Sequence, residues 1–225
     1  MKKTPIILMV LITILLLGCS DKVTELNNDV EFPDLETLEY TFLMWYQEDD
    51  IWEESVWKAE LKYNSIFGGE PSVNFRFNGI IFHLNFEYDN EQWYTAIINL
   101  SEFELKFGNN VQIDLVTPSG SYTNKLQLPY PPRFTTPNLV IYPDEDLTVK
   151  WELEKDPLLQ NLYLYISTYD GSYTQYNYLN RKIREFTYLR SELPNNIRGA
   201  NIYLECVNFI IEEKNIFVAS IGAQL

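Results

Sequence analysis

One histidine and two cysteines restrict the chemistry open to this 225-residue chain. A zinc site with two histidines is excluded within one chain, because His83 is the only histidine, and there is no C-x-x-C pair. A Ser-His-Asp triad would have to use His83, yet the sequence contains no G-x-S-x-G elbow. His83 lies on the polar side of an alternating segment beside Asn85 and Glu87. We therefore expect a surface histidine, no catalytic residue, no metal site and no cofactor.

Carboxylates are the remaining side chains that could perform acid–base chemistry or bind a cation. They form two clusters, Glu48, Asp49, Asp50, Glu53 and Glu54 in one, and Asp144, Glu145 and Asp146 in the other. Neither cluster has the ordered spacing of a calcium loop, so we expect solvated turns. A pair of glycosidase carboxylates stays open as an alternative, because the distance between them exists only in three dimensions.

Tyrosines are the most distinctive candidates for binding, since aromatic residues make up 15% of the chain. A two-residue turn at residues 170–171 would place Tyr165 opposite Tyr176 and Tyr163 opposite Tyr178, so that all four share one sheet face. A tyrosine has an apolar body and a polar tip, so such a face suits sugar rings or a protein surface. Two alternatives remain: the tyrosines only stabilise the sheet, or a three-residue turn directs Tyr176 and Tyr178 inward.

The first twenty residues indicate export and lipid attachment. Lys2 and Lys3 precede the apolar run Pro5–Leu17, which is shorter than the roughly 20 residues that a bilayer span needs. The following Leu16-Leu17-Gly18-Cys19 resembles the lipobox of bacterial lipoproteins. The resemblance implies a diacylglyceryl group on the Cys19 sulfur and removal of residues 1–18 as a signal peptide. Two or three acyl chains, at about 0.8 kcal/mol per buried methylene, anchor a protein stably.

The residue after Cys19 and the net charge of the whole chain predict where the mature protein is located. In the sorting rule of many two-membrane bacteria an Asp after the cysteine favours the inner membrane, so Ser20 favours the outer one. Residues 19–34 are predicted to form a polar tether. The formal net charge of -15 repels phosphate backbones and anionic lipid, which excludes nucleic acid as a partner and leaves lipid on Cys19 as the membrane contact.

Period-two alternation in the rest of the chain predicts an all-β fold. Asn78-Gly79 predicts a tight hairpin that pairs Phe77 with Ile80 and Phe75 with Phe82. A second hairpin is predicted across 108–110, pairing 103–107 with 111–115, and a third is predicted to turn at 117–120.

Prolines at positions 129, 131, 132 and 137 predict a stiff linker over 129–136, between a β-rich domain at 35–128 and a second domain at 137–225. The second domain has strands predicted at 146–151, 162–169, 183–189, 202–211 and 216–221. This order, with a strand ending in Trp151 and a terminal hairpin, resembles a fibronectin type III or related immunoglobulin-like β-sandwich. Cys206 has no partner there for a disulfide between the sheets, which favours the fibronectin-like form. We therefore predict two tandem β-sandwich domains, and the resemblance implies adhesion, spacing or ligand display.

These observations lead to one main hypothesis and two alternatives. The chain is expected to be a lipid-anchored, non-enzymatic cell-envelope protein that binds or supports another envelope component. The first alternative is a glycan-binding surface lipoprotein that uses Tyr163, Tyr165, Tyr176 and Tyr178. The second is a hydrolase that uses paired carboxylates.

Overall fold

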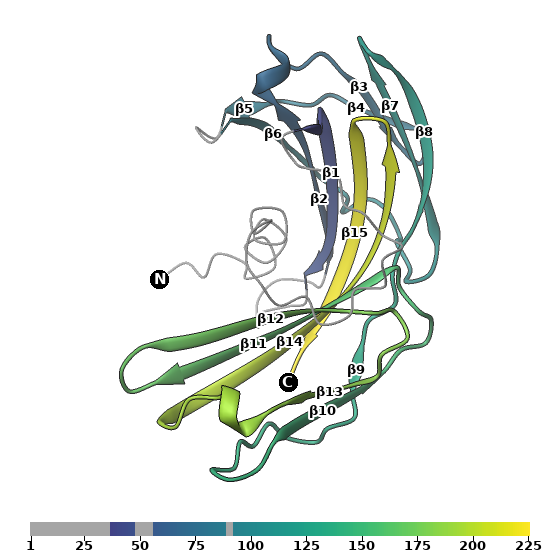
Figure 1. Ribbon diagram of the computed structural model, residues 1–225. Helices are drawn as coiled ribbons and strands as arrows, with labels where there is room; N and C mark the ends of the chain where they lie inside the picture. The colour runs from purple at the N-terminus through teal and green to yellow at the C-terminus, as the bar shows by residue number, and fades with distance from the viewer. Residues whose placement is uncertain (1–36, 48–55, 89–91) are drawn as a thin grey trace.

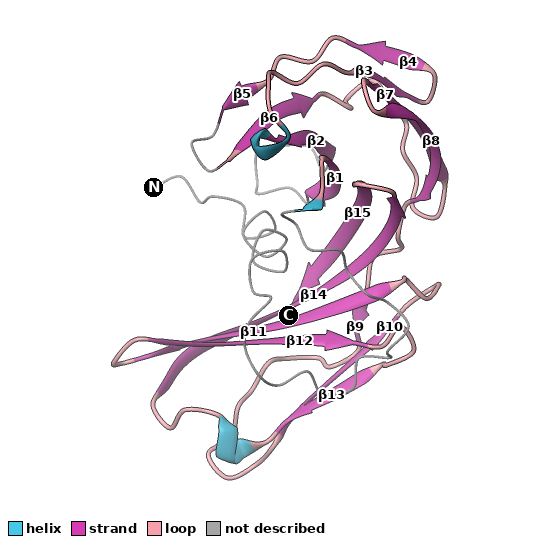
Figure 2. Cartoon of the chain, turned by 45° about the horizontal axis from the view of Figure 1, so that its top comes forward, coloured by secondary structure: helices cyan, strands magenta, loops and turns pink. Residues whose placement is uncertain are grey.

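The protein is all-β in the computed structural model, which describes residues 37–47, 56–88 and 92–225. Helical structure in these ranges is limited to short 3-10 turns such as Ser65–Phe67 and Arg190–Glu192 (Figure 2). Accordingly, the described part of the chain has no helix with the length and apolar character needed to cross a bilayer. The predicted fold class, a β-sandwich chain, is confirmed.

Three sheets make up the described structure, and the largest has eight strands. In spatial order its strands are β12 (Ser172–Leu179), β11 (Leu159–Thr168), β14 (Ile197–Glu212), β15 (Asn215–Gln224), β1 (Tyr40–Gln47), β2 (Val56–Asn64), β6 (Trp93–Ile98) and β5 (Glu87–Tyr88). A four-stranded sheet contains β4 (Ile80–Phe82), β3 (Asn74–Phe77), β7 (Asn110–Thr117) and β8 (Gly120–Gln127). A three-stranded sheet contains β13 (Glu185–Tyr188), β10 (Leu147–Glu152) and β9 (Arg133–Phe134).

The large sheet is curved, and both small sheets lie on its outer side (Figure 1). The four-stranded sheet covers the β15–β1–β2 end, and the three-stranded sheet covers the β12–β11–β14 end. The result is two sandwiches that share one continuous layer.

The upper core, under the four-stranded sheet, is aromatic. Phe42 on β1 stacks on Phe75 of β3 with ring centroids 5.5 Å apart, and Phe77 and Phe217 are also almost fully buried. Alternation explains the arrangement, since every second residue of β1 and β3 points into the same layer.

The lower core, under the three-stranded sheet, is built around Trp151. Leu147, Val149 and Trp151 are buried on one side of β10, as the alternation predicts. The Trp151 indole is 2% exposed and its Nε1 donates to Gln160 Oε1 at 2.7 Å, so the one polar atom of the ring is satisfied inside the core.

Two of the three predicted hairpins of the first part of the chain are confirmed. Phe77 pairs with Ile80 and Phe75 with Phe82, with Asn78 at φ 48° and Gly79 at φ 82° in the turn. Both turn residues have the positive φ that a two-residue turn of this kind requires. The turn at 117–120 also forms, with β7 and β8 on either side of it.

The predicted pairing of 103–107 with 111–115 is wrong. Residues 103–107 form no strand; Phe103, Leu105 and Phe107 instead pack as a loop against the upper core. Strand β7 pairs on one edge with β8 and on the other with β3, where Phe77 lies opposite Ile113. Both edges of β7 are therefore occupied, and no position is left for a third neighbour.

The terminal hairpin crosses the predicted division between 35–128 and 137–225. Strand β14 pairs with β11 through its first part and with β15 through its second part. Strand β15 then pairs in parallel with β1, with Phe42 opposite Phe217. The first and last described strands are therefore neighbours in one sheet, and the two sandwiches are joined by backbone hydrogen bonds rather than only by the linker at 129–136.

Candidate functional site

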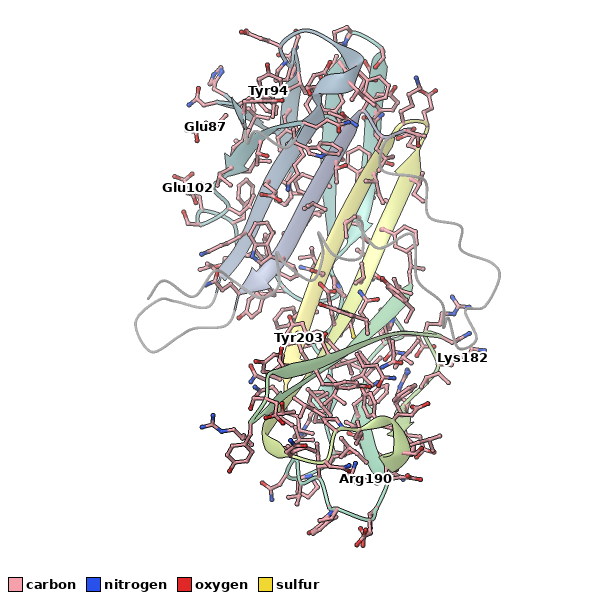
Figure 3. The ribbon with its side chains drawn as sticks, turned by 60° about the vertical axis from the view of Figure 1, so that its left-hand side comes forward. Glu87, Tyr94, Glu102, Lys182, Arg190 and Tyr203 are labelled. Carbon is pink, nitrogen blue, oxygen red and sulfur yellow. The ribbon has the colours of Figure 1, made fainter. Side chains whose placement is uncertain are left out.

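One face of the large sheet points away from both small sheets, and we call it the free face (Figure 3). The residues of β11 and β14 that enter the lower core carry even numbers, such as Leu162 and Leu204, so odd-numbered residues lie on the free face. Two neighbouring rows then cross the strands. One runs Tyr176–Tyr163–Tyr203, and the other runs Tyr178–Asn161–Glu205–Gly222.

The four predicted tyrosines do share a face, but their predicted pairing is wrong. Ser167 pairs with Ser172, so the turn spans residues 168–171 instead of 170–171. Tyr163 consequently lies opposite Tyr176, Tyr165 opposite Thr174, and Tyr178 opposite Asn161. A shift of two residues preserves the face of every side chain, whereas a shift of one would have reversed it.

The Tyr163 and Tyr176 rings form an aromatic contact on this face, with centroids 4.7 Å apart and planes inclined by 42°. Burial, together with the neighbouring Tyr176, raises the pKa of Tyr163 to about 12. Both side chains are half-buried, as are those of Tyr165 and Tyr178. The Tyr163 hydroxyl therefore stays neutral and able to donate a hydrogen bond at any physiological pH.

Tyr203 is a fifth tyrosine on the free face, and the sequence patterns did not identify it. It lies on β14 between Tyr163 of β11 and Gln224 of β15, near the point where the two halves of the large sheet meet (Figure 3). Its ring extends over Gly222, because a Cβ atom at that position would overlap the Tyr203 hydroxyl and the adjacent ring carbon. Glycine at 222 is thus the residue that lets the ring lie flat against the sheet.

A buried carboxyl group lies beside these rings. Glu205 is 0% exposed, and its Oε2 accepts a hydrogen bond from Asn161 Nδ2 at 3.0 Å. Burial raises the pKa of Glu205 to about 7, and the Asn161 amide and the Ser220 hydroxyl oppose that rise. The other oxygens, Glu205 Oε1 and Asn161 Oδ1, accept no hydrogen bond from the described residues. These two buried oxygens therefore have hydrogen-bonding capacity that the described residues do not fill.

Beyond Glu205 the free face becomes apolar. Six buried side chains form a strip: Leu38, Leu43, Leu159, Val207, Ile216 and Val218. Tyr178 and Phe209 pack against this strip, so Tyr178 connects the tyrosine cluster to it. The free face thus combines aromatic rings, buried acceptors and an aliphatic strip within one continuous sheet.

The other chemical candidates are placed as follows. His83 is exposed, and Asp144, Glu145 and Asp146 lie on the surface, where Asp146 Oδ1 accepts from the Arg190 backbone N–H at 2.7 Å. Cys206 is fully buried, and burial raises the pKa of its thiol, so it is an unreactive core residue.

The predicted signal peptide at 1–18, Cys19, the tether at 19–34 and the acidic cluster at 48–54 lie outside the described residues. Within the described residues, no three His, Cys, Asp or Glu side chains are grouped so that they could hold a metal ion.

Comparison with known proteins assigns no family. No protein-family model matches the chain, and no curated protein is significantly similar to it. The free face therefore has to be interpreted from its own chemistry.

Proposed function

We propose that this chain is a non-enzymatic, lipid-anchored protein of the cell envelope that binds its partner on the free face of the large sheet. The proposal rests on one observation above all: Glu205 is fully buried outside both sandwich cores and among tyrosines, and its Oε1 and the adjacent Asn161 Oδ1 accept no hydrogen bond from the described residues. A buried polar group without a partner is costly, typically about 1–3 kcal/mol, and such costs are retained mainly at functional positions.

Anchoring through lipid on Cys19 and localisation to the outer membrane, where one exists, complete the proposal. The lipobox supports the anchor, and the fibronectin-like strand order of the second half supports ligand display. A tether at 19–34 would give the folded part access to partners at a distance from the membrane.

The partner surface expected from this chemistry is part aromatic or aliphatic and part hydrogen-bond donor. The half-exposed Tyr163 and Tyr176 offer ring faces, and their hydroxyl oxygens can accept hydrogen bonds from groups that donate. A partner of this kind would gain affinity from a few central contacts rather than from total buried area.

A substitution pair tests the binding face. Tyr163→Ala with Tyr176→Ala should lower recovery of envelope components by the full lipidated chain at least tenfold, about 1.4 kcal/mol. The matched control is Tyr169→Ala, since Tyr169 is 75% exposed at the hairpin end and pairs with Arg198 instead of the face. Equal recovery by both variants, with unfolding temperatures unchanged, would remove the free face as the binding surface.

A glycan is the second candidate partner, and the paired Tyr163 and Tyr176 rings are the observation that favours it. Sugar rings stack on tyrosine while their hydroxyls donate to nearby acceptors. A glycan array probed with the native chain, with Tyr165→Ala and with Tyr176→Ala should show binding that both substitutions abolish. Absence of binding to every glycan on the array would leave a protein partner as the occupant of this face.

A further inference from the structure

The margins of the three sheets differ in how well they are protected. Strand β12 forms one margin of the large sheet, and β5 forms the other (Figures 1 and 2). Strands β5 and β9 have two residues each, β4 has three and β13 has four. Short edges of this kind offer little backbone for another strand to pair with.

Only β8 and β12, among the described edge strands, have eight residues, and only β8 is protected. It contains Lys125, and the β14–β15 turn contacts it through Tyr122 Oη donating to Glu213 Oε2 at 2.9 Å and Asn124 Nδ2 donating to Glu212 Oε2 at 2.7 Å. Strand β12 reads SYTQYNYL and has neither a charge nor a proline. Natural proteins use both devices to prevent edge pairing, so their absence over a long strand indicates a strand meant to be paired.

We propose that two copies of this chain pair antiparallel through β12, about a two-fold axis at Tyr176, and so join their large sheets into one. In this register Tyr176 lies opposite Tyr176 of the second copy. Gln175 lies opposite Asn177, Thr174 opposite Tyr178, and Tyr173 opposite Leu179.

The register is self-complementary on both faces. On the core side, the Gln175 and Asn177 amides lie opposite each other, and the Tyr173 ring lies opposite Leu179. On the free face, every pair joins residues that carry a hydroxyl group. Residue i pairs with residue 352 − i, so every pair joins side chains of the same face, and the two free faces become continuous. A register displaced by one residue would place the tyrosines of one copy on the core side of the other.

Charge also favours a second copy in this orientation. The net charge of -15 makes two copies repel in general, but the stretch 171–180 contains no charged residue. Asp170 and Lys182 lie at opposite ends of that stretch, and both are exposed; Lys182 lies beyond one end of β12 in Figure 3. Antiparallel pairing brings Asp170 of each copy towards Lys182 of the other, which gives attraction at both ends.

Disulfide trapping tests the pairing in the full lipidated chain. Tyr176→Cys places two thiols on the axis, where opposite Cα atoms lie about 4.5–5.5 Å apart, within disulfide range. Ser172→Cys is the matched control on the same strand and face, but its two copies would lie about 26 Å apart along the strands. Mild oxidation should produce linked dimers from Tyr176→Cys only. Equal linking by both variants, or none by Tyr176→Cys, would overturn the proposal.

Charge reversal supplies an independent test. Asp170→Lys and Lys182→Asp should each weaken dimerisation several-fold in sedimentation at low salt, and the two together in one chain should restore it. Asp170 Oδ2 also accepts from Asn196 Nδ2 at 2.6 Å, so the unfolding temperature of each variant is measured alongside. A native chain that sediments as a monomer at concentrations up to hundreds of micromolar would overturn the proposal. A dimer whose dissociation constant is unchanged by both charge reversals would overturn it as well.

Discussion

Glu205 makes the free face sensitive to pH. Its pKa in the folded chain, raised by burial to about 7, lies above the ordinary value of 4.5, so the folded state holds the proton more tightly than the unfolded state. Folding is therefore most favoured with Glu205 protonated, and that advantage is lost as the pH rises from about 4.5 through 7.

The consequence is measurable by denaturant unfolding at pH 5 and pH 8. The shift in pKa corresponds to about 2–3 kcal/mol of stability lost between these two pH values. Glu205→Gln keeps the shape and the hydrogen bond to Asn161 but cannot ionise, so it should lose less stability between the two pH values and exceed the native chain at pH 8. An identical pH response in the two proteins would show that Glu205 ionises freely and is not buried in solution.

Cys19 is the residue on which the proposed location depends. Cys19→Ser should abolish incorporation of labelled palmitate and leave the uncleaved precursor, because no sulfur remains for the diacylglyceryl group. Cys206→Ser is the control, since the Cys206 thiol is buried in the sheet and should not affect processing. Mass spectrometry of the native protein that finds residues 1–18 attached to an unmodified Cys19 would contradict the lipoprotein assignment.

At the scale of the elements, Gly222 of β15 leaves the space that the Tyr203 ring of β14 occupies. A methyl group at Gly222 would overlap Tyr203, and forcing extra atoms into a packed site typically costs about 1–3 kcal/mol. Gly222→Ala should therefore destabilise the native chain by that amount and be nearly neutral in a Tyr203→Ala background. Equal costs in both backgrounds, measured as a double-mutant cycle, would show that the ring does not lie over residue 222.

Sequence patterns predicted those elements whose signals are local. Asn78-Gly79 set its own hairpin register, and the alternation of Leu147, Val149 and Trp151 identified the buried side of β10. Period two assigns a face to each residue but says nothing about which strand lies beside it. For that reason the pattern assigns residues 103–107 to a strand pair that does not form, and it does not predict the pairing of β1 with β15, which are distant in sequence.

Parity along a strand also determines which residues of the candidate site can be predicted from the sequence. The four tyrosines were placed on one face despite a turn two residues longer than predicted, because a shift of two leaves parity unchanged. Tyr203 and Glu205 were missed because they join the cluster through the pairing of β14 with β11. Two signals were available: both residues have odd numbers in a predicted strand, and Glu205 is a carboxylate next to Cys206 in an apolar run.

At the scale of the whole molecule, the shared sheet determines how the two sandwiches unfold. Strand β14 contacts the lower core through Ile202 and Leu204 and the upper core through Ile210. Strand β15 pairs with β14 on one side and with β1 on the other. Two domains joined only by a flexible linker would unfold independently. Here separation of the halves would break the backbone ladder between β15 and its neighbours, so the halves are coupled.

Trp151→Ala tests that coupling by destabilising the lower sandwich and following the response of the upper one. Loss of the indole should destabilise the lower sandwich by about 3–5 kcal/mol, because the ring is buried and Gln160 loses its hydrogen-bond donor. Hydrogen exchange of β2 and β7, in the upper sandwich, should then accelerate together with that of β10 and β13 under conditions where the whole molecule opens. Trp151→Phe keeps most of the ring volume. It should therefore raise the exchange rates of both pairs of strands by less, and in the same proportion. Faster exchange confined to β10 and β13 would mean that the two sandwiches unfold separately. The lower sandwich could then open while the β14–β15 hairpin stays paired in the upper one.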